Sequence, residues 1–321
     1  MKFLITGGAG FIGSSVTDKL LETGNSVICL DSFDDFYNPS IKRENIRKAL
    51  QHKNYLLVEE DIRNKSFLEK FLSENKVDAV IHLAARAGVR PSIANPELYY
   101  DVNLNGTLVL LEEMRKANIT KMIFASSSSV YGNNEKVPFS EDDNVDFPIS
   151  PYAASKKSAE LLCHTYHHLY AFDIFCLRFF TVYGPRQRPE MAIHKFARNI
   201  MSKKAIQMFG DGSSKRDYTY IDDIVSGVIG SVNNLKGYEI VNLGESQTIS
   251  LANLITVLEK KIGTKAIIEK LPEQPGDVSV TNADISKARR ILNYSPQTTI
   301  EEGIDKFVSW VLKKKTDTLV P

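Results

Sequence analysis

Two residues one helical turn apart, Tyr152 and Lys156, form the pattern in this sequence that most directly suggests catalysis. A free tyrosine has a pKa of about 10, which is too high for a base at neutral pH. A cation held close to the phenol favours the phenolate and lowers that pKa by roughly 1–3 units. Residues four apart share one face of a helix, so the Lys156 ammonium can lie near the Tyr152 ring. The chain has 13 tyrosines, so the spacing alone also fits an exposed helix face, and the remaining sequence must decide.

The composition is that of an ordinary globular chain without a strong charge field. Its 321 residues are 43% hydrophobic and 25% charged, which suffices for a normal core and about two domains. The formal net charge of +1 favours neither nucleic acid nor an anionic membrane as a partner. Any anionic ligand must therefore be met by local groups, and we expect no nucleic-acid partner and no membrane partner.

The cysteines and the first residues indicate a reducing compartment. Cys29, Cys163 and Cys176 are odd in number and far apart, which argues against a disulfide framework. The apolar run at 3–5 leads straight into a glycine turn and leaves no room for a signal peptide. No run approaches the ~18 apolar residues of a membrane span. We expect a cytoplasmic protein.

The first half of the chain alternates short apolar runs with helical patterns. Strands are expected at 3–6, 27–30, 55–59, 79–83, 122–126 and 175–179, and helices at 14–22, 66–75, 99–117 and 152–170. Strands that alternate with helices and are apolar throughout form a parallel sheet covered on both faces. The pattern predicts an α/β fold with a Rossmann-type doubly wound parallel sheet in an N-terminal domain of residues 1–180.

The regular alternation of short apolar runs and helical patterns ends after residue 180. Gly-Pro and Arg-Pro pairs interrupt it, and shorter elements follow, with helices near 191–202, 222–232 and 250–261 and a strand near 239–242. We interpret residues 181–315 as a smaller C-terminal α/β domain that mainly binds substrate. Residues 316–321 are expected to form a frayed tail.

A glycine-rich turn follows the first expected strand and opens the first helix. Gly7, Gly10 and Gly13 permit a tight turn, close approach of backbone to phosphate, and close packing of helix on strand. The helix that opens at Phe11 and Ile12 can then present its free backbone amides to a pyrophosphate. The turn therefore predicts a dinucleotide site.

The acidic residue that ends the second strand selects among dinucleotides. Asp31, 18 residues beyond Gly13, is placed to accept both hydroxyls of an adenosine ribose. Its carboxylate would repel a 2′-phosphate, and Ser32-Phe33 offers no compensating arginine. NAD is therefore favoured over NADP.

Two further strand ends offer cofactor contacts. Asp61-Ile62 follows the strand at 55–59 and could meet the adenine edge, although Asp61 could instead cap the next helix. Backbone can also approach the cofactor at the residues after the fourth strand, which are Leu83, Ala84 and Ala85. His82, on the same apolar strand, is interpreted as a core histidine and not as a catalyst.

Four consecutive serines, Ser126 to Ser129, leave the strand at 122–126. They put hydroxyls at the carboxyl edge of the sheet, where open α/β sheets bind ligands. A serine there could hydrogen-bond a sugar hydroxyl and relay its proton to Tyr152. The alternative is a turn solvated by its own serines.

The combination of motifs resembles the extended short-chain dehydrogenase/reductase family, and within it the nucleotide-sugar epimerases and dehydratases. The resemblance covers nearly the whole chain. It is carried by four motifs in order, which are the glycine turn at 6–13, the serine run at 126–132, the Tyr152–Lys156 pair, and the strand and loop at 177–185.

The resemblance implies a catalytic set of Ser127, Tyr152 and Lys156 working with tightly bound NAD. Tyr152 as phenolate would take the proton of a sugar 4-hydroxyl while carbon 4 is oxidised, and Lys156 would hold the nicotinamide ribose and keep Tyr152 ionised. Phe179 would line the cofactor site. Asn103 lies where the family often has a polar brace, although it could also be an ordinary buried hydrogen-bonding residue.

The residues beside a 4-keto intermediate distinguish the reactions of this family. The related dehydratases carry Asp-Glu where this chain has Ser128-Ser129, and the related decarboxylases tend to carry Glu at the position of Ser129. Hydroxyls cannot replace paired carboxylates in acid–base work. An epimerase needs only room for the keto-sugar to turn, so Ser128 and Ser129 favour 4-epimerisation.

The sugar is indicated by segments 34–43, 85–92 and 186–192, which look like those of UDP-glucuronate 4-epimerases. A 6-carboxylate needs a fixed donor fork, which arginine supplies. Arg188 is the first candidate for this clamp and Arg90 the second, and Thr181 could hydrogen-bond the carboxylate end. Either arginine could instead meet the diphosphate or a surface acid.

The resemblance also implies a nucleotide site and a partner. Arg216 would neutralise diphosphate charge, Tyr218 could pack nearby, and Asp277 would bind the uridine ribose. The helices at 99–117 and 152–170 pair into a homodimer's four-helix interface in related proteins. His164 and His167 share a helix face, but no carboxylate or cysteine completes a metal site, so none is expected.

The leading hypothesis is NAD-dependent 4-epimerisation of UDP-glucuronate to UDP-galacturonate. The alternative is a 4-epimerase of a neutral UDP-sugar, either UDP-glucose or UDP-N-acetylglucosamine. A UDP-glucuronate decarboxylase and a non-catalytic NAD-binding protein rank below both. The second of these usually lacks the tyrosine or the lysine, and both are present here.

Overall fold

The structure is a computed structural model that describes residues 1–272 and 278–317. Asp277 and the end of the expected frayed tail, 318–321, lie outside the described residues. Helix α12 (Ile300–Asp317) extends two residues into that expected tail.

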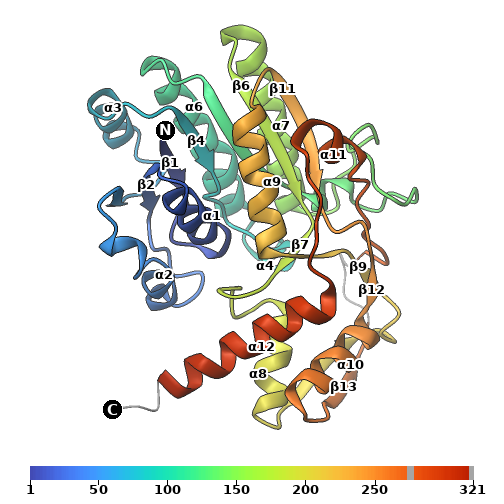
Figure 1. The fold of residues 1–321 in the computed structure, drawn as a ribbon. Coiled ribbons are helices and arrows are strands. Elements are labelled where there is room, and N and C mark those ends of the chain that lie inside the picture. Colours follow the sequence, from blue (N-terminus) through green and yellow to red (C-terminus); the bar gives the residue numbers. More distant parts are fainter. Residues whose placement is uncertain (273–277, 318–321) are drawn as a thin grey trace.

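A seven-stranded parallel sheet forms the centre of the molecule (Figure 1). Its strands are β1 (Lys2–Thr6), β2 (Ser26–Asp31), β3 (Tyr55–Glu59), β4 (Ala79–His82), β5 (Lys121–Ser127), β6 (Asp173–Phe179) and β11 (Tyr238–Leu243). They run in the order β11-β6-β5-β4-β1-β2-β3. The order of the first six is that of the Rossmann-type sheet, so the predicted fold class is confirmed.

Helices cover both faces of this sheet. Helices α1 (Phe11–Glu22) and α9 (Ile221–Asn234) pack on one face, and α3 (Lys65–Glu74), α6 (Gly106–Lys116) and α7 (Pro151–Tyr170) on the other (Figure 1). Alternate side chains of each strand point to opposite faces. In β1, for example, Phe3 and Ile5 join the core under α1 and α9, whereas Leu4 joins the core under α3, α6 and α7.

The helix expected at 99–117 has a local defect. It consists of α5 (Pro96–Tyr100), a π-helical turn η2 (Asp101–Asn105) and α6. Single π-turns within helices occur frequently at functional sites. This one carries Asn103, whose side chain faces the site described below.

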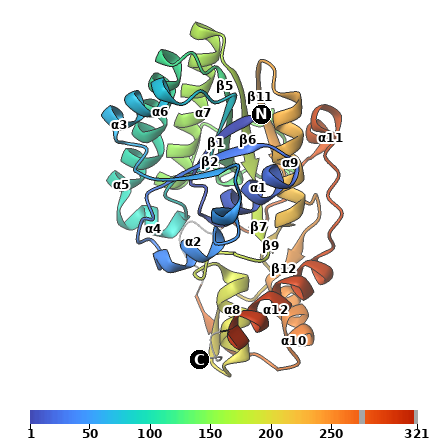
Figure 2. The same ribbon diagram turned by 60° about the vertical axis from the view of Figure 1, so that its left-hand side comes forward.

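A second group of elements lies beneath the carboxyl edge of the sheet (Figures 1 and 2). It contains α8 (Ala192–Met201), α10 (Leu251–Ile262), α12 and a parallel pair of strands, β8 (Ala205–Phe209) and β13 (Ile267–Leu271). Shorter elements complete the chain: α2 (Pro39–Asn45), η1 (Ala49–Gln51), α4 (Val89–Ala94), η3 (Ser128–Tyr131), β7 (Thr181–Tyr183), β9 (Lys215–Arg216), β10 (Tyr218–Tyr220), β12 (Ile249–Ser250) and α11 (Ser286–Leu292).

The strand expected near 239–242 does not belong to a separate C-terminal unit. As β11 it pairs in parallel with β6 over six residue pairs, from Tyr238 with Ile174 to Leu243 with Phe179. It reaches that edge because α9 crosses back over the sheet beside α1, as a parallel connection requires. The expected boundary at residue 180 stays a prediction, but this strand and the helix α9, expected near 222–232, were assigned to the wrong unit.

Across residues 1–272 and 278–317, we found no helix with both the length and the apolar character that a membrane crossing requires.

Candidate active site

A cavity of about 500 Å³ opens at the carboxyl edge of the sheet and brings together most of the predicted site residues. The predicted residues that line it are Gly7, Gly10, Phe11, Ile12, Gly13, Asp31, Asp61, Ile62, Leu83, Ala84, Ala85, Ser127, Ser128, Ser129, Tyr152, Lys156, Phe179, Thr181 and Arg188. Residues from the ends of β1, β2, β4, β5 and β6 therefore share one space, as the parallel sheet requires.

The glycine turn is too tight for side chains. A Cβ on Gly13 would lie 2.3 Å from the Gly7 carbonyl oxygen, and a Cβ on Gly7 would lie 2.7 Å from the Ala84 nitrogen. Gly7 also has a φ of 68°, which L side chains rarely adopt. Helix α1 begins after Gly10, with no side chain capping its first amides. This cradle fits a pyrophosphate, as predicted.

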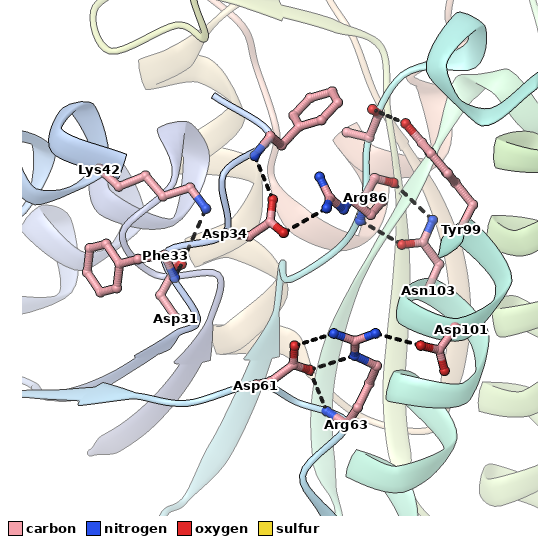
Figure 3. Close-up of polar contacts among 12 residues, drawn as sticks. Asp31, Phe33, Asp34, Lys42, Asp61, Arg63, Arg86, Tyr99, Asp101 and Asn103 are labelled. Carbon is pink, nitrogen blue, oxygen red and sulfur yellow. Dashed lines mark hydrogen bonds and ion pairs between the residues drawn. The ribbon is translucent and has the colours of Figure 1, made fainter. Parts of the chain in front are cut away.

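Asp31 is held in place by backbone and by a lysine (Figure 3). Its carboxylate accepts from the Ala9 amide at 3.1 Å and from the Phe33 amide at 2.9 Å, and it lies 3.6 Å from the Lys42 ammonium. Lys42 is itself buried and lines the cavity. The sequence analysis missed Lys42 because it arrives from α2, eleven residues after Asp31.

Asp61 pairs with an arginine and does not cap a helix. Arg63 donates to the two carboxylate oxygens of Asp61 at 3.0 and 2.7 Å and to Asp101 at 2.5 Å (Figure 3). The pairing with Arg63 holds the pKa of Asp61 below its usual value. The following helix α3 is capped by Asn64, so the reading of Asp61 as a helix cap is wrong, and its contact with the cofactor stays a prediction.

His82 is a core histidine, as predicted. Its ring nitrogens pair with the hydroxyls of Thr6 at 2.6 Å and Thr107 at 3.0 Å. Burial lowers the pKa of His82 to about 3, so the ring is neutral at physiological pH.

Asn103 does not line the cavity but supports its wall through hydrogen bonds to Arg86, which does. Its amide oxygen accepts from the Arg86 backbone amide at 2.7 Å, while its nitrogen donates to the Arg86 carbonyl and to the Ser155 hydroxyl, both at 3.0 Å. It therefore joins the loop after β4, where Figure 3 shows its bonds to Arg86, to helix α7 through Ser155. The Arg86 guanidinium in turn pairs with Asp34 at 2.8 Å, linking the loops after β4 and β2.

The start of α7 positions Tyr152. Ser150 caps the helix by accepting from the Ala153 amide at 3.1 Å. The Tyr152 amide donates to the Ser92 hydroxyl at 3.1 Å, and the Tyr152 ring meets the edge of the Tyr99 ring at a centroid distance of 6.2 Å. Ser92 and Tyr99 were not identified from the sequence, since neither belongs to a motif.

Lys156 is almost fully enclosed, with 4% of its surface exposed. Its ammonium donates to the Ala125 carbonyl at 2.7 Å and lies 5.0 Å from the Phe124 ring centroid. Burial lowers its pKa to about 8, although nearby Glu160 opposes the shift. The ammonium thus reaches the end of β5, beside Ser127.

The electrostatics at Tyr152 differ from the sequence expectation. Burial raises the pKa of Tyr152 above its ordinary value, and a hydrogen bond from Ser127 and the charge of Arg188 only partly oppose that rise. The prediction that Lys156 lowers the pKa of Tyr152 is therefore wrong for the protein without bound ligand. Lys156 is not among the groups that lower the pKa of Tyr152, and desolvation of the phenolate dominates.

The serines after β5 form a short 3-10 turn. The Ser127 hydroxyl caps it, accepting from the Ser129 amide at 3.2 Å, and it also pairs with the Ser129 hydroxyl at 3.1 Å. The serines satisfy one another, as expected for a turn solvated by its own hydroxyls, and Ser127 also partly opposes the rise in the pKa of Tyr152. The proton relay stays a prediction.

The structure distinguishes the two candidate arginines by their positions relative to the cavity. Arg188 lines the cavity, pairs through Nε with Glu190 at 2.6 Å, and its charge lowers the pKa of Tyr152. Arg90 is exposed and stacks over Phe209 at 4.6 Å, and it does not line the cavity. The geometry favours Arg188 over Arg90 as the group beside the reacting end.

A second cavity of about 160 Å³ adjoins the first through Ser128, Ser129 and Thr181. Arg216 lines it, as the prediction of a diphosphate contact requires. Tyr218 does not line it and instead packs edge-on against Tyr183 at 6.3 Å.

Asp217, which lies between Arg216 and Tyr218, orders the loops around the second cavity. Its buried carboxylate accepts from the backbone amides of Glu245, Ser246 and Ala283 at 2.7 to 3.0 Å. Its role escaped the sequence analysis because its partners are distant in the chain.

Among the described residues we found no group of three or more His, Cys, Asp or Glu side chains that could hold a metal ion.

Comparison with known proteins places the chain among nucleotide-sugar enzymes. The family model described as GDP-mannose 4,6 dehydratase matches residues 4–307. A UDP-glucuronate 4-epimerase of Thermodesulfobacterium geofontis is 48% identical over 96% of this chain and 95% of its own length.

Two solved structures are similar throughout. The UDP-glucuronic acid 4-epimerase of Bacillus cereus, in complex with UDP-glucuronic acid and NAD, matches with a TM-score of 0.92 and 38% identity over 98% of this chain and 100% of that chain. The UDP-glucose 4-epimerase of Thermotoga maritima, with UDP-glucose, matches with a TM-score of 0.91 and 33% identity over the same shares.

The tight glycine turn generates a test of the cofactor site. Gly13→Ala places a methyl group against the Gly7 carbonyl, so the turn must open, at a cost of roughly 1–3 kcal/mol or more. We expect a lower melting temperature and purified protein that has lost most of its bound dinucleotide, measured in the supernatant after denaturation.

The matched control is Gly24→Ala at the other end of α1. Gly24 has a φ of 80° but open space at the Cβ position, so alanine there strains the backbone away from the cavity. That variant should lose stability and keep its dinucleotide. Full dinucleotide retention in Gly13→Ala would contradict the assignment of the turn.

Proposed function

The chain belongs to the extended short-chain dehydrogenase/reductase family, in the branch matched by the GDP-mannose 4,6 dehydratase model, and we propose that it is a UDP-glucuronate 4-epimerase. The reaction is the NAD-dependent interconversion of UDP-glucuronate and UDP-galacturonate through a transient 4-keto sugar. The observation that carries the choice of sugar is Arg188, a cation in the main cavity close enough to lower the pKa of Tyr152. A guanidinium at that place suits a sugar with a carboxylate at carbon 6.

The cofactor site is proposed to run across the sheet edge from Asp31 to Lys156. Asp31 would hold the adenosine ribose, the amides after Gly10 the pyrophosphate, and Lys156 the nicotinamide ribose. Bound there, NAD would supply a reversible hydride acceptor for carbon 4, taking up a hydride as NAD⁺ and giving it back as NADH.

The chain's own residues handle the proton. Tyr152 takes the proton of the sugar 4-hydroxyl, directly or through the Ser127 hydroxyl, which partly opposes the rise in the pKa of Tyr152. The Lys156 ammonium, fixed at the Ala125 carbonyl, stabilises the phenolate that must form for the transfer. After the keto-sugar turns, Tyr152 returns the proton to the oxygen at carbon 4.

The reaction should stop at epimerisation because the residues proposed to surround the keto-sugar, Ser128 and Ser129, are not acid–base groups. Ser128 and Ser129 line both cavities, at the place where dehydration would need paired carboxylates. Small hydroxyl side chains leave room for the keto-sugar to rotate. Thr181, which also lines both cavities, is proposed to contact the sugar.

The second cavity is proposed to receive the nucleotide. Arg216 would meet the diphosphate, and the loop that carries Asp277, which lies outside the described residues, is proposed to bind the uridine ribose. Tyr218 is proposed to support this end through its packing on Tyr183 and not by direct contact.

Incubation with three UDP-sugars and no added NAD tests the proposed reaction. We expect UDP-glucuronate to be converted to UDP-galacturonate, with little conversion of UDP-glucose or UDP-N-acetylglucosamine, measured by chromatography of the sugars. Tyr152→Phe should lower the rate by at least about a hundredfold, because general base catalysis contributes at least that much. If UDP-glucuronate is unchanged while a neutral sugar is converted, the alternative epimerase is correct.

Arg188 generates a prediction about a side product. A 4-keto sugar whose carbon 5 bears a carboxylate is a β-keto acid and loses carbon dioxide readily. We propose that Arg188 holds the carboxylate near the ring plane, where the breaking bond cannot overlap the ketone. Arg188→Ala and Arg188→Lys should therefore slow epimerisation and release a UDP-pentose, detected by mass spectrometry.

Arg90→Ala provides the comparison, because Arg90 lies outside the main cavity. If both Arg188 variants epimerise at the wild-type rate and release no pentose, the hypothesis that Arg188 holds the carboxylate is wrong. Pentose from Arg90→Ala would transfer the role to the second candidate.

We propose that the protein forms a homodimer through α6 and α7. The two helices pack side by side, and α7 exposes Leu161 and Leu169, which are 57% and 59% exposed and lie on one helix face. Leu161→Glu should convert a dimer into a monomer by sedimentation velocity, whereas Leu50→Glu, at an exposed leucine on η1, should not. A monomeric wild-type protein would exclude this interface.

We also propose a cytoplasmic location, because Cys29, Cys163 and Cys176 are all buried free thiols. Cell fractionation is the measurement, and recovery from an oxidising compartment would contradict the proposal.

A further inference from the structure

A buried ion pair lies directly behind the catalytic helix. The Arg178 guanidinium on β6 donates to both carboxylate oxygens of Glu160 on α7, with both distances at 2.9 Å. The Ser126 hydroxyl on β5 donates to the same carboxylate at 2.5 Å. Both charged side chains are only 1% exposed.

The position of Glu160 connects this pair to the site. Glu160 follows Lys156 by one helical turn, and Ser126 immediately precedes Ser127. The Glu160 carbonyl also accepts from the Tyr238 hydroxyl at 3.0 Å. One residue of α7 is therefore bonded to β5, β6 and β11, which fixes both the rotation and the height of the helix against the sheet.

Stability does not explain such a pair. Removing two charges from water costs several kcal/mol per ion, and apolar residues of similar volume are often as stable. Neither Glu160 nor Arg178 lines either cavity, so neither is available to contact substrate. Their effect on the reaction must pass through a neighbour.

We propose that Glu160 is a positioning residue that keeps Lys156 in its ammonium form and in place at the end of β5. The proposal rests on the proposed catalytic role of Lys156. The Glu160 carboxylate supplies negative charge on the same helix, while its bonds to Arg178 and Ser126 prevent it from turning to Lys156 and neutralising it directly. Lys156 then remains bonded to the Ala125 carbonyl, beside Ser127.

The other groups around this pair do not supply the same charge. Arg178 stacks on the Tyr131 ring at 4.8 Å, and Lys157 lies 3.9 Å from the Glu160 carboxylate, so both neighbours are cationic. The Cys163 and Cys176 thiols and the Tyr238 hydroxyl also lie near, and burial raises the pKa of Cys176 and Tyr238, which keeps them neutral. On the far side of Lys156, His82 is neutral. Among the described residues, Glu160 is the carboxylate whose charge opposes the decrease in the pKa of Lys156.

The expected pH dependence has a definite sign. Burial lowers the pKa of Lys156 to about 8, and Cys163 and, after it, the charge of Glu160 oppose that decrease. Without the carboxylate the pKa of Lys156 falls further, so the ammonium is lost at a lower pH. The alkaline limb of the profile of kcat against pH should therefore move to lower pH.

Glu160→Gln and Glu160→Asp separate charge from shape in the NAD-containing enzyme. Glu160→Gln keeps the size of the side chain, and we expect its alkaline limb to shift downward by on the order of one pH unit. Glu160→Asp keeps the charge but shortens the side chain, so kcat should fall while the limb stays near that of the wild type. KM should change little in either variant, because Glu160 lies outside both cavities.

Glu113→Gln is the matched control, since Glu113 is a buried, lysine-paired carboxylate on α6, away from Ser126 and Lys156. Its pH profile should match the wild type. If Glu160→Gln does not fold, Glu160→Gln with Arg178→Gln removes both charges together, and we expect a downward shift that is smaller, because the cation Arg178 is lost as well.

Two outcomes would overturn the proposal. One is a folded Glu160→Gln enzyme whose alkaline limb is unmoved, and the other is an equal shift in Glu113→Gln. Full activity of Tyr152→Phe, measured in the same assay, would instead mean that the proposed catalytic pair is wrong, so the two failures can be told apart.

Discussion

Keeping a charged lysine inside the protein is the constraint on which the rest of the site depends. Lys156 is buried, and its ammonium has a fixed acceptor in the Ala125 carbonyl at 2.7 Å. A buried charge is costly unless it is paired or hydrogen-bonded. The acceptor comes from β5, and Glu160, whose charge opposes the lowering of the Lys156 pKa, comes from α7, so the strand and the helix must meet in one register. That register also brings Ser127 to Tyr152.

The sheet supplies this register and the cofactor cradle at the same edge. Parallel strands end together, so the turn after β1, Asp31 after β2 and Ser127 at the end of β5 all open into one cavity. Asn103 ties the loop after β4 to α7 and therefore couples the cofactor side of the cavity to the catalytic side. The π-helical turn that carries Asn103 makes this reach possible without ending the helix.

What could be predicted from the sequence was local in the chain. Apolar runs and glycine spacing identified β1 to β6 and the cradle at Gly7 and Gly13, because these depend on neighbouring residues. The pairing of β11 with β6, the approach of Lys42 to Asp31 and the bonds of Glu160 could not be predicted, because each joins segments whose spacing carries no periodic signal. The sequence ranked Arg188 before Arg90 as the clamp but could not place either, and the fold puts only Arg188 of the two in the main cavity.

The raised pKa of Tyr152 shows how the proposed clamp and the base influence each other. Desolvation dominates at Tyr152, and the charge of Arg188 is one of the two influences that oppose it. A substrate carboxylate bound to Arg188 would neutralise much of that charge, so the help from Arg188 would weaken when the sugar is in place. The phenolate must then depend on Lys156, whose charge no substrate group neutralises. An enzyme for an acidic sugar therefore depends more on a charged lysine than an enzyme for a neutral sugar does. Glu160, one turn along α7, is placed to keep Lys156 in its ammonium form.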